Sequence, residues 1–501
     1  MTDHIERRTG TYYDSVTLMR VSAAVKKTPG VSEALIGMGT ELNLDLIVSA
    51  DFVLPDGVGP NDLLVALRAD DDAAIEAGLA AVEETFAELK RASAASSGKE
   101  TAVPVRTMAS AARSGSTIAL ISVPGAHAFA PAMEAIESGQ SVMLFSDNVP
   151  VEQEIALKDA ARAHDVLVMG PDCGTAVVNG VAMGFANVTT PGSVGVIAAS
   201  GTGAQQVMCL LDEAGTGVSH VLGLGGRDLS AQVGGRSARQ ALEALAADEA
   251  TTSVILVSKP ADPDVVASLD ATATDLGVTL SWATLAPSTP DLTKAVEDAL
   301  HTSGTAVPEW EAHVAPASDA PRGSDLRGLF CGGTLADEAM MIARSELGPI
   351  RSNIPLAVDA EADIAVRGTD AYSGHTVIDF GDDDMTQGRP HPMIDPSLRL
   401  ERIVEQGSDA TCGVLLLDLV LGYCAHPDPA ADLAAAVRAA RAAAADDGRD
   451  LAVVVSLVGT DQDPQDRSAC ITALTEAGAS VFSSNARATR HALSLLPTTA
   501  H

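Results

Sequence analysis

The sequence lacks the features that mark membrane, secreted and zinc-binding proteins. No apolar run reaches the roughly 18 residues that a membrane-spanning helix needs, and the polar stretch Thr2–Arg8 is unlike a secretory signal. The cysteines form no CxxC pair, which argues against a zinc knuckle or a disulfide framework. They are dispersed at Cys173, Cys209, Cys331, Cys412, Cys424 and Cys470. We therefore expect a cytoplasmic protein with reduced thiols and no membrane association.

Positive charge is also scarce, with 32 lysines and arginines against 67 acidic residues and a net charge of -35. Such a chain repels a nucleic-acid backbone and anionic lipid, so nucleic acid is excluded as a partner. A solvated, self-repelling surface explains the acidity better than an acidic docking site does. An anionic substrate would need local help from backbone N–H groups or from forked donors such as Arg227, Arg236 and Arg389.

The length of 501 residues and the apolar content of 46% allow several buried cores and predict three or four domains, and the order of helix and strand patterns along the chain predicts the α/β class. Residues 1–92 carry helix patterns over 14–27 and 71–92 and a strand-like run over 34–38, which predicts a small α+β unit. A stretch rich in Ala and Ser, 92–103, follows as a predicted linker.

Strand-like and helical segments then alternate as far as residue 303, in the rhythm of a doubly wound parallel sheet. Residues 304–324, rich in Pro, Ala and Ser, are predicted to link this region to a third α/β block over 325–495. The Ala-rich run 428–445 is predicted to be a covering helix, because Ala has the highest helix propensity.

Two strand-to-helix junctions carry small, Gly-rich turns. One follows the apolar run Val194–Ala199, and the other follows Leu326–Phe330. Backbone N–H groups in such a turn point outward at the positive end of the helix dipole and favour a phosphate or a carboxylate. The two similar junctions predict one anion held between facing helices. The predicted anion-binding residues are Ser200, Gly201, Thr202 and Gly203 in the first turn and Gly332, Gly333 and Thr334 in the second.

Several short motifs occur in the order found in the α subunit of succinyl-CoA synthetase. They are Ile121–Pro124, Gly170–Gly174, Ser200–Gly203 and Gly223–Asp228. Residues 325–495 resemble the C-terminal ligase domain of the β subunit, fused behind it. With the segment Gly388–Asp395, the whole arrangement closely resembles the FdrA family of acyl-CoA synthetase-like proteins.

The resemblance implies three further domains behind the N-terminal unit. Residues 105–192 would form a Rossmann-like CoA-binding domain, and residues 193–303 and 325–495 would form two flavodoxin-like ligase domains. It also implies CoA or substrate contacts at Pro124, His127 and Arg227. Separately encoded partner subunits and an oligomeric assembly are expected on the same ground.

The departures from the succinyl-CoA synthetases bear on mechanism. Those enzymes phosphorylate a histidine in the α ligase domain, whereas this chain has no histidine between His220 and His301. The segment Ser258–Pro263 offers no nitrogen nucleophile of that kind. There is also no GxxxxGK[ST] loop and no recognisable ATP-grasp domain. We therefore expect that the chain alone does not use ATP, and that its substrate is phosphate, an acyl phosphate or carbamoyl phosphate.

The FdrA family is associated with carbamoyl transfer between oxamate and carbamoyl phosphate in purine-derived ureide degradation. The leading hypothesis is therefore a carbamoyl- or acyltransferase subunit in which Arg389, His391 and Asp395 act on the reacting group. One alternative is an acyl-CoA synthetase subunit that binds CoA. Another is a noncatalytic scaffold or CoA-sensing subunit.

Two further features have two interpretations each. Cys173 is either a nucleophile that forms a thioester or a small buried residue that shapes its loop, and the second is favoured. Asp379 and Asp382–Asp384 could hold a divalent cation, but a hydrated acidic turn explains them as well, so no metal is predicted.

Overall fold

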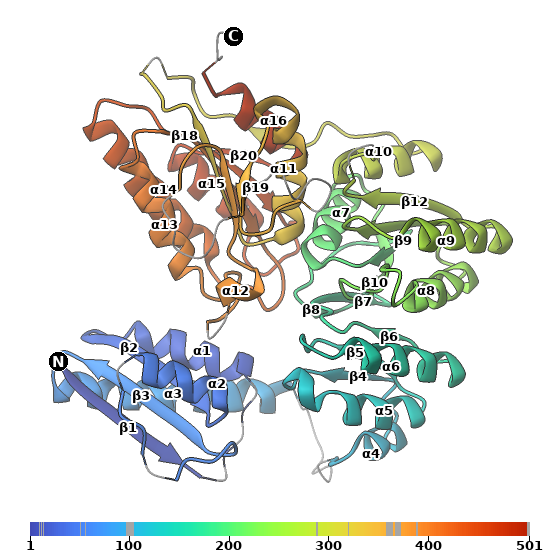
Figure 1. The fold of residues 1–501 in the computed structure, drawn as a ribbon, viewed down its shortest axis with the longest axis horizontal. Coiled ribbons are helices and arrows are strands. Elements are labelled where there is room, and N and C mark those ends of the chain that lie inside the picture. The colour runs from blue at the N-terminus through green and yellow to red at the C-terminus, as the bar shows by residue number, and fades with distance from the viewer. Residues whose placement is uncertain are drawn as a thin grey trace. The chain divides into compact units, whose positions relative to one another are not determined.

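The protein is mixed α/β, as expected, and consists of two compact units (Figure 1). One unit comprises Met1–Pro104 with Thr386–Pro390, and the other comprises Val105–Met385 with His391–His501. The computed structural model describes residues 1–9, 11, 13, 15–50, 52–55, 57–96, 105–286, 289–318, 320–356, 364–365, 372–386 and 389–497. No helix among these residues is long and apolar enough to cross a membrane.

The N-terminal unit is an antiparallel sheet of order β1-β3-β2 with helices packed on it. Its strands are β1 (Thr2–Arg8), β2 (Val31–Met38) and β3 (Leu63–Ala69), and its helices are α1 (Ser15–Lys26), α2 (Glu41–Ser49) and α3 (Asp72–Ser96). Alternation along β3 sends Leu63, Val65 and Leu67 towards α1 and α3, and Leu64 and Ala66 towards Ile47 of α2. Helix α3 extends four residues beyond the predicted helix end at residue 92, because Ala and Ser are compatible with a helix.

A small parallel sheet of order β4-β5-β6 begins the second unit. Its elements are α4 (Met108–Arg113), β4 (Ile118–Ile121), α5 (Phe129–Glu137), β5 (Ser141–Leu144), α6 (Val151–Ala163) and β6 (Val168–Met169), with a 3-10 turn at Gly125–His127. The next hairpin, β7 (Thr175–Val178) and β8 (Val181–Gly184), pairs with β10 instead. Strand pairing thus assigns this hairpin to the following sheet, although the sequence placed it in the 105–192 domain.

The second sheet of this unit has six strands in the order β12-β11-β9-β10-β7-β8. Its remaining strands are β9 (Pro191–Ala198), β10 (Val218–Gly223), β11 (Ser253–Ser258) and β12 (Thr279–Thr284). One hydrophobic cluster packs α8 (Arg236–Ala247) and α9 (Pro263–Leu276) on one face, and another packs α7 (Gly201–Glu213) and α10 (Leu292–Thr302) on the opposite face.

The third sheet has eight strands in the order β13-β20-β19-β18-β14-β17-β15-β16. They are β13 (Ala312–His313), β14 (Asp325–Phe330), β15 (Arg351–Ser352), β16 (Ile364–Ala365), β17 (Thr376–Asp379), β18 (Cys412–Val420), β19 (Ala452–Val458) and β20 (Ser480–Phe482). Strand β13 lies inside the predicted linker and pairs with β20. Strand β18 is buried along its whole length, as expected for a central parallel strand covered on both faces.

Helices cover both faces of this eight-stranded sheet (Figure 1). On one face lie α13 (Ser397–Gly407), α14 (Pro429–Asp446) and α15 (Arg467–Glu476), and on the other lie α11 (Gly333–Leu347) and α16 (Asn485–Ser494). Helix α14 is the predicted Ala-rich covering helix. A short helix, α12 (Asp383–Thr386), follows β17.

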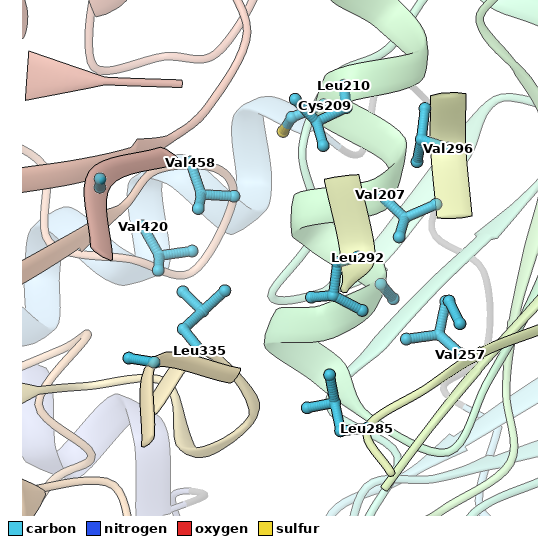
Figure 2. Packing of buried hydrophobic residues seen from close by; sticks show 14 of the residues in the cluster. Val207, Cys209, Leu210, Val257, Leu285, Leu292, Val296, Leu335, Val420 and Val458 are labelled. Carbon is cyan, nitrogen blue, oxygen red and sulfur yellow. The ribbon is translucent and has the colours of Figure 1, made fainter. Parts of the chain in front are cut away.

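The six-stranded and eight-stranded sheets share one hydrophobic cluster, because α7 and α10 pack against α11 and α16. Figure 2 shows part of this cluster, which includes Val207 of α7, Leu292 of α10 and Leu335 of α11. Burial of apolar surface from both sheets in one cluster holds the two turns at the start of α7 and α11 in a fixed relation.

Candidate functional site

The two Gly-rich turns lie where the sequence predicted, each between a central parallel strand and a helix. Strand β9 leads into α7, and β14 leads into α11. Ser200 caps α7, since its Oγ accepts the N–H of Gly203 at 3.0 Å. Gly332 occupies the same position before α11, without a side-chain cap.

The structure brings the starts of α7 and α11 together. Ser200 Oγ and Thr334 Oγ1 lie 2.6 Å apart, although 134 positions separate them in the chain. A β-carbon on Gly203 would lie 3.0 Å from the Thr334 methyl group, and one on Gly332 would lie 2.9 Å from Thr202 Oγ1. Each turn therefore needs a glycine where the threonine of the other turn packs against it.

Both helix starts leave backbone donors unused. In the described part of the chain, the N–H groups of Gly201 and Thr202 in α7, and of Gly333 and Thr334 in α11, meet no hydrogen-bond acceptor. The first N–H groups of a helix need partners from outside it. These four groups, with the helix dipoles behind them, form the candidate anion site.

Gly332 differs from the prediction that its N–H binds the anion. The carboxylate of Asp418, at the end of β18, accepts the N–H of Cys331 at 2.8 Å and that of Gly332 at 2.9 Å. Asp418 is fully buried and is paired with Arg399 at 2.8 Å. The carboxylate of Asp418 thus already accepts the first two N–H groups of the second turn. Only the N–H groups from Gly333 onward remain for a ligand.

Lys259 is a site residue that sequence reasoning missed. It follows β11, and its Nζ lies 2.8 Å from Asp337 of α11. The same Nζ is 3.9 Å from the position that a β-carbon on Gly333 would take. Although burial lowers the pKa of Lys259, the charges of Asp337, Asp379 and Asp382 raise it overall, so the amine stays positive. The sequence feature that could have identified it is a lysine directly after an apolar strand in a chain with few lysines.

Two carboxyl groups accompany Lys259, the buried Asp379 and the more exposed Asp172. Asp379 ends β17, and burial raises its pKa to about 7. Asp172 has its pKa raised to about 6 by burial and by the charges of Asp383 and Asp147, while Arg227 and Lys259 act in the opposite direction. Groups whose pKa lies near neutrality are typical of sites that transfer protons.

The predicted catalytic residue His391 is buried beside this site. Its Nε2 lies 2.6 Å from the position of a β-carbon on Gly381, and its ring contacts the ring of Phe185 at 5.8 Å between centroids. Burial lowers its pKa to about 4, so the imidazole is neutral at pH 7, and its catalytic role stays a prediction. Because Nδ1 accepts the N–H of Met393 at 3.2 Å, the proton is assigned to Nε2, which can still polarise a neighbouring group.

The other two predicted catalytic residues have different surroundings. Arg389 is exposed and belongs to the segment Thr386–Pro390, which clusters with the N-terminal unit. Asp395 Oδ1 accepts the N–H of Ser397 at 3.0 Å and so holds the start of α13. Catalytic roles for both stay predictions. Gly388, in the same motif, lies outside the described residues.

Cys173 is best explained by packing. It is 2% exposed, burial raises its pKa to about 12, and its Sγ lies 2.4 Å from the position of a β-carbon on Gly223. A thiol that stays protonated is a poor nucleophile, so the structure favours the interpretation that Cys173 shapes its loop.

The predicted CoA or substrate contacts lie on the surface of the first parallel sheet and its neighbour. Pro124 and His127 are exposed, directly after β4. Arg227 is 43% exposed and is held by Glu154 at 2.9 Å and by the carbonyl of Val149 at 2.7 Å. Roles in binding CoA stay predictions for all three. Another arginine considered as an anchor, Arg236, pairs with Asp159 at 2.8 Å.

Two regions bear on metal binding, the acidic turn after β17 and the N-terminal unit. The described residues contain no group of three or more His, Cys, Asp or Glu side chains arranged to hold a metal ion, which includes the acidic turn after β17. The N-terminal unit also contains no thiol, because Cys173 is the first cysteine of the chain. Soft metals are bound mainly through cysteine, so residues 1–103 do not fit a heavy-metal site.

Two sequence families match the chain. Residues 329–495 match the CoA-ligase family, and residues 1–103 match the family described as AllF, heavy metal-associated domain. The C-terminal match covers α11, Asp379, His391 and Asp418, and so includes half of the candidate site. The N-terminal match concerns a unit whose residues do not fit the metal named in that description.

The chain is also similar to individual proteins. The chain is 36% identical to the uncharacterized protein YahF of Escherichia coli over 476 residues, which are 90% of each chain. It is 27% identical to the mitochondrial succinate–CoA ligase subunit alpha-2 of Trichomonas vaginalis over 152 residues, 29% of this chain and 48% of that subunit. An acetyl-coenzyme A synthetase of Ca. Korarchaeum cryptofilum shares 15% identity over 76% of this chain and 82% of its own, with a TM-score of 0.29. The chain therefore belongs to the FdrA-like family of proteins with a CoA-ligase domain.

Proposed function

We propose that the chain transfers an acyl group between phosphate and an acceptor at the paired starts of α7 and α11. The observation that carries this proposal is the 2.6 Å contact between Ser200 and Thr334, which places two sets of unused N–H groups at one point. Two helix starts and the Lys259 ammonium suit the charge of a phosphate. Thr202 and Thr334 add hydroxyl groups from the two sides.

The acceptor proposed first is the thiol of CoA, because the CoA-ligase family match includes the second turn. Acyl phosphate and CoA would then give acyl-CoA and phosphate, the half of a ligase reaction that needs no nucleotide. The neutral Nε2–H of His391 is a candidate to polarise the acyl carbonyl. Arg389 is proposed as an additional anchor for an anionic substrate.

Carbamoyl transfer between phosphate and oxamate is the second candidate. It is supported by membership in the FdrA-like family and by the positive charge of Lys259 beside the second turn. A donor that arrives as carbamoyl phosphate needs no phosphohistidine. Separately encoded partner subunits would supply the groups that this chain lacks, and an oligomer is proposed on the same ground.

The test is phosphate release from acetyl phosphate, succinyl phosphate and carbamoyl phosphate, with CoA or oxamate as the acceptor, in the full chain alone and with its genomic neighbours. Release that depends on CoA supports the first candidate, and release from carbamoyl phosphate that depends on oxamate supports the second. If all pairs are inactive and neither CoA nor phosphate binds in calorimetry, the remaining interpretation is a noncatalytic scaffold. Unchanged rates in Arg389→Ala and His391→Ala would remove those residues from the mechanism.

A further inference from the structure

Asp379 is a buried carboxyl group that faces the candidate phosphate site and has no role in the binding described above. It is 5% exposed and ends β17, next to the first turn of α11. Its Oδ2 lies 2.6 Å from the position that a β-carbon on Gly333 would take, and the described residues offer this oxygen no hydrogen-bond donor. An anion at the unused N–H groups of α11 would lie beside it.

The position of this carboxyl group is held firmly. The N–H of Asp379 donates to Asn353 Oδ1 at 2.9 Å, and its carbonyl accepts from Asn353 Nδ2 at 2.8 Å. On the side chain, Oδ1 accepts the N–H of Gly381 at 2.8 Å. Three hydrogen bonds thus fix the residue while Oδ2 stays available, which is the preorganisation that proton transfer requires.

Two like charges cannot be buried side by side, so an anion here requires that either Asp379 or the anion holds a proton. We propose that Asp379 is the proton-transferring residue of this site, which carries a proton from the acceptor to the departing phosphate; this rests on the proposed function. The acceptor X–H attacks the carbonyl carbon, the C–X bond forms, and the proton moves to Asp379 Oδ2. The bond from the carbonyl carbon to the phosphate oxygen then breaks, and that oxygen takes the proton. The bound acyl phosphate carries the other proton on its phosphate group, so the products are acyl-X and dihydrogen phosphate, and the carboxylate is regenerated.

The groups that face Asp379 come from four elements. Lys259 follows β11 and is paired with Asp337 of α11, Asp418 lies near the end of β18, and Asp382 follows β17. His391 lies beside Gly381, but its pKa of about 4 keeps it neutral above pH 5. Asp172 also interacts with Lys259, and its pKa is about 6. Because this pKa is close to that of Asp379, an experiment must distinguish the titration of the two residues.

The experiment is calorimetric titration of the full chain with sulfate between pH 5.5 and 8.5, since sulfate does not titrate in this range and inorganic phosphate does. We expect wild-type affinity to fall about tenfold from pH 6 to pH 8, because Asp379 must take up a proton to bind a second anion beside it. Asp379→Asn, whose amide oxygen still accepts the Gly381 N–H, should bind equally well at both pH values. Asp172→Asn should retain the fall near pH 7.

A second readout needs no variant. Wild-type protein at pH 8 should take up close to one proton per sulfate, measured in buffers of different ionisation enthalpy. Sulfate binding without proton uptake, or an equal pH dependence in Asp379→Asn and wild type, would overturn the role of Asp379 while the phosphate site stands. Failure of wild type and Asp379→Asn to bind either sulfate or inorganic phosphate at any pH would instead overturn the proposed function, and this role with it.

Discussion

The starts of α7 and α11 are two versions of one arrangement. Helix α7 reads Gly-Thr-Gly-Ala-Gln-Gln from Gly201, and α11 reads Gly-Thr-Leu-Ala-Asp-Glu from Gly333. Each helix also carries a side chain that accepts a backbone N–H at the start of a helix from the other sheet. Gln206 Oε1 accepts the N–H of Asn485 at the start of α16, and Glu338 Oε1 accepts the N–H of Leu292 at the start of α10. The correspondence suggests that the two halves descend from a duplicated unit.

The two helices differ in charge. Helix α7 buries two neutral amides, Gln205 and Gln206, where α11 buries two acids, Asp337 and Glu338. Two further buried acids, Asp379 and Asp418, lie around the second turn. The first turn is capped by the hydroxyl group of Ser200. In the described part of the chain, no buried carboxylate accepts a hydrogen bond from its N–H groups. In the proposed function, both turns offer N–H groups to an anion, Lys259 adds positive charge beside the second turn, and the acids around α11 can hold protons.

The largest expected effect concerns the carboxylate that fills the second turn. Asp418→Ala leaves two N–H groups without an acceptor and leaves the buried Arg399 guanidinium without its counter-ion, although its carbonyl partners remain. We expect the free energy of unfolding, measured by urea denaturation, to fall by about 3–5 kcal/mol. If Asp418→Ala lowered the free energy of unfolding by only about 1 kcal/mol, as expected for removal of the Ser200 cap, the two turns would be stabilised to the same extent.

Glu338 provides a pH-dependent comparison with its counterpart Gln206. Burial raises the pKa of Glu338 from 4.5 to about 7, so its contribution to stability is full below pH 4.5 and is lost as pH rises through 7. We expect Glu338→Gln to stabilise the protein at pH 8 relative to wild type, on the order of 3 kcal/mol, and to change little at pH 4.5. Thermal unfolding at both pH values measures this difference, and parallel pH profiles would contradict it.

Substitution of alanine for the first glycine of each helix, Gly333 in α11 and Gly201 in α7, should have different effects. A β-carbon at Gly333 collides with Asp379 Oδ2, whereas one at Gly201 meets only Thr175 Oγ1 at 3.3 Å. Gly333→Ala should therefore cost about 1–3 kcal/mol of unfolding free energy and weaken sulfate binding more than Gly201→Ala does. Gly201→Ala is the matched control, with an expected stability change below about 1 kcal/mol. Equal sulfate affinities in the two variants would argue against an anion beside Asp379.

The smallest effect is expected at the cap of the first turn. Ser200→Ala removes the acceptor for the Gly203 N–H and the partner of Thr334. We expect a loss of about 1 kcal/mol in the free energy of unfolding, with sulfate binding retained because the N–H groups of Gly201 and Thr202 are unaffected. Loss of sulfate binding in a folded Ser200→Ala protein would mean that the hydroxyl itself holds the anion.

Much of the architecture was predictable because it is encoded locally. Apolar runs ended by small residues identified β9 and β14, and the turns after them identified the starts of α7 and α11. The hairpin β7–β8 was assigned to the neighbouring domain, because its strand pairing with β10 depends on residues about 40 positions away. The third strand of the N-terminal unit, β3, was not predicted either, since its inward and outward residues are both apolar and it has no alternation.

The sequence by itself determined the strand-turn-helix units, their order and the Gly-rich turns that start α7 and α11, because these depend on neighbouring residues. Only the tertiary structure decided that the two turns meet, that Asp418 closes half of the second one, and that Lys259 and Asp379 stand beside the open half. These residues come from separate strands, and Lys259 and Asp379 lie 120 positions apart in the chain. Their proximity results from the packing of two sheets around one shared hydrophobic cluster, which no local pattern encodes.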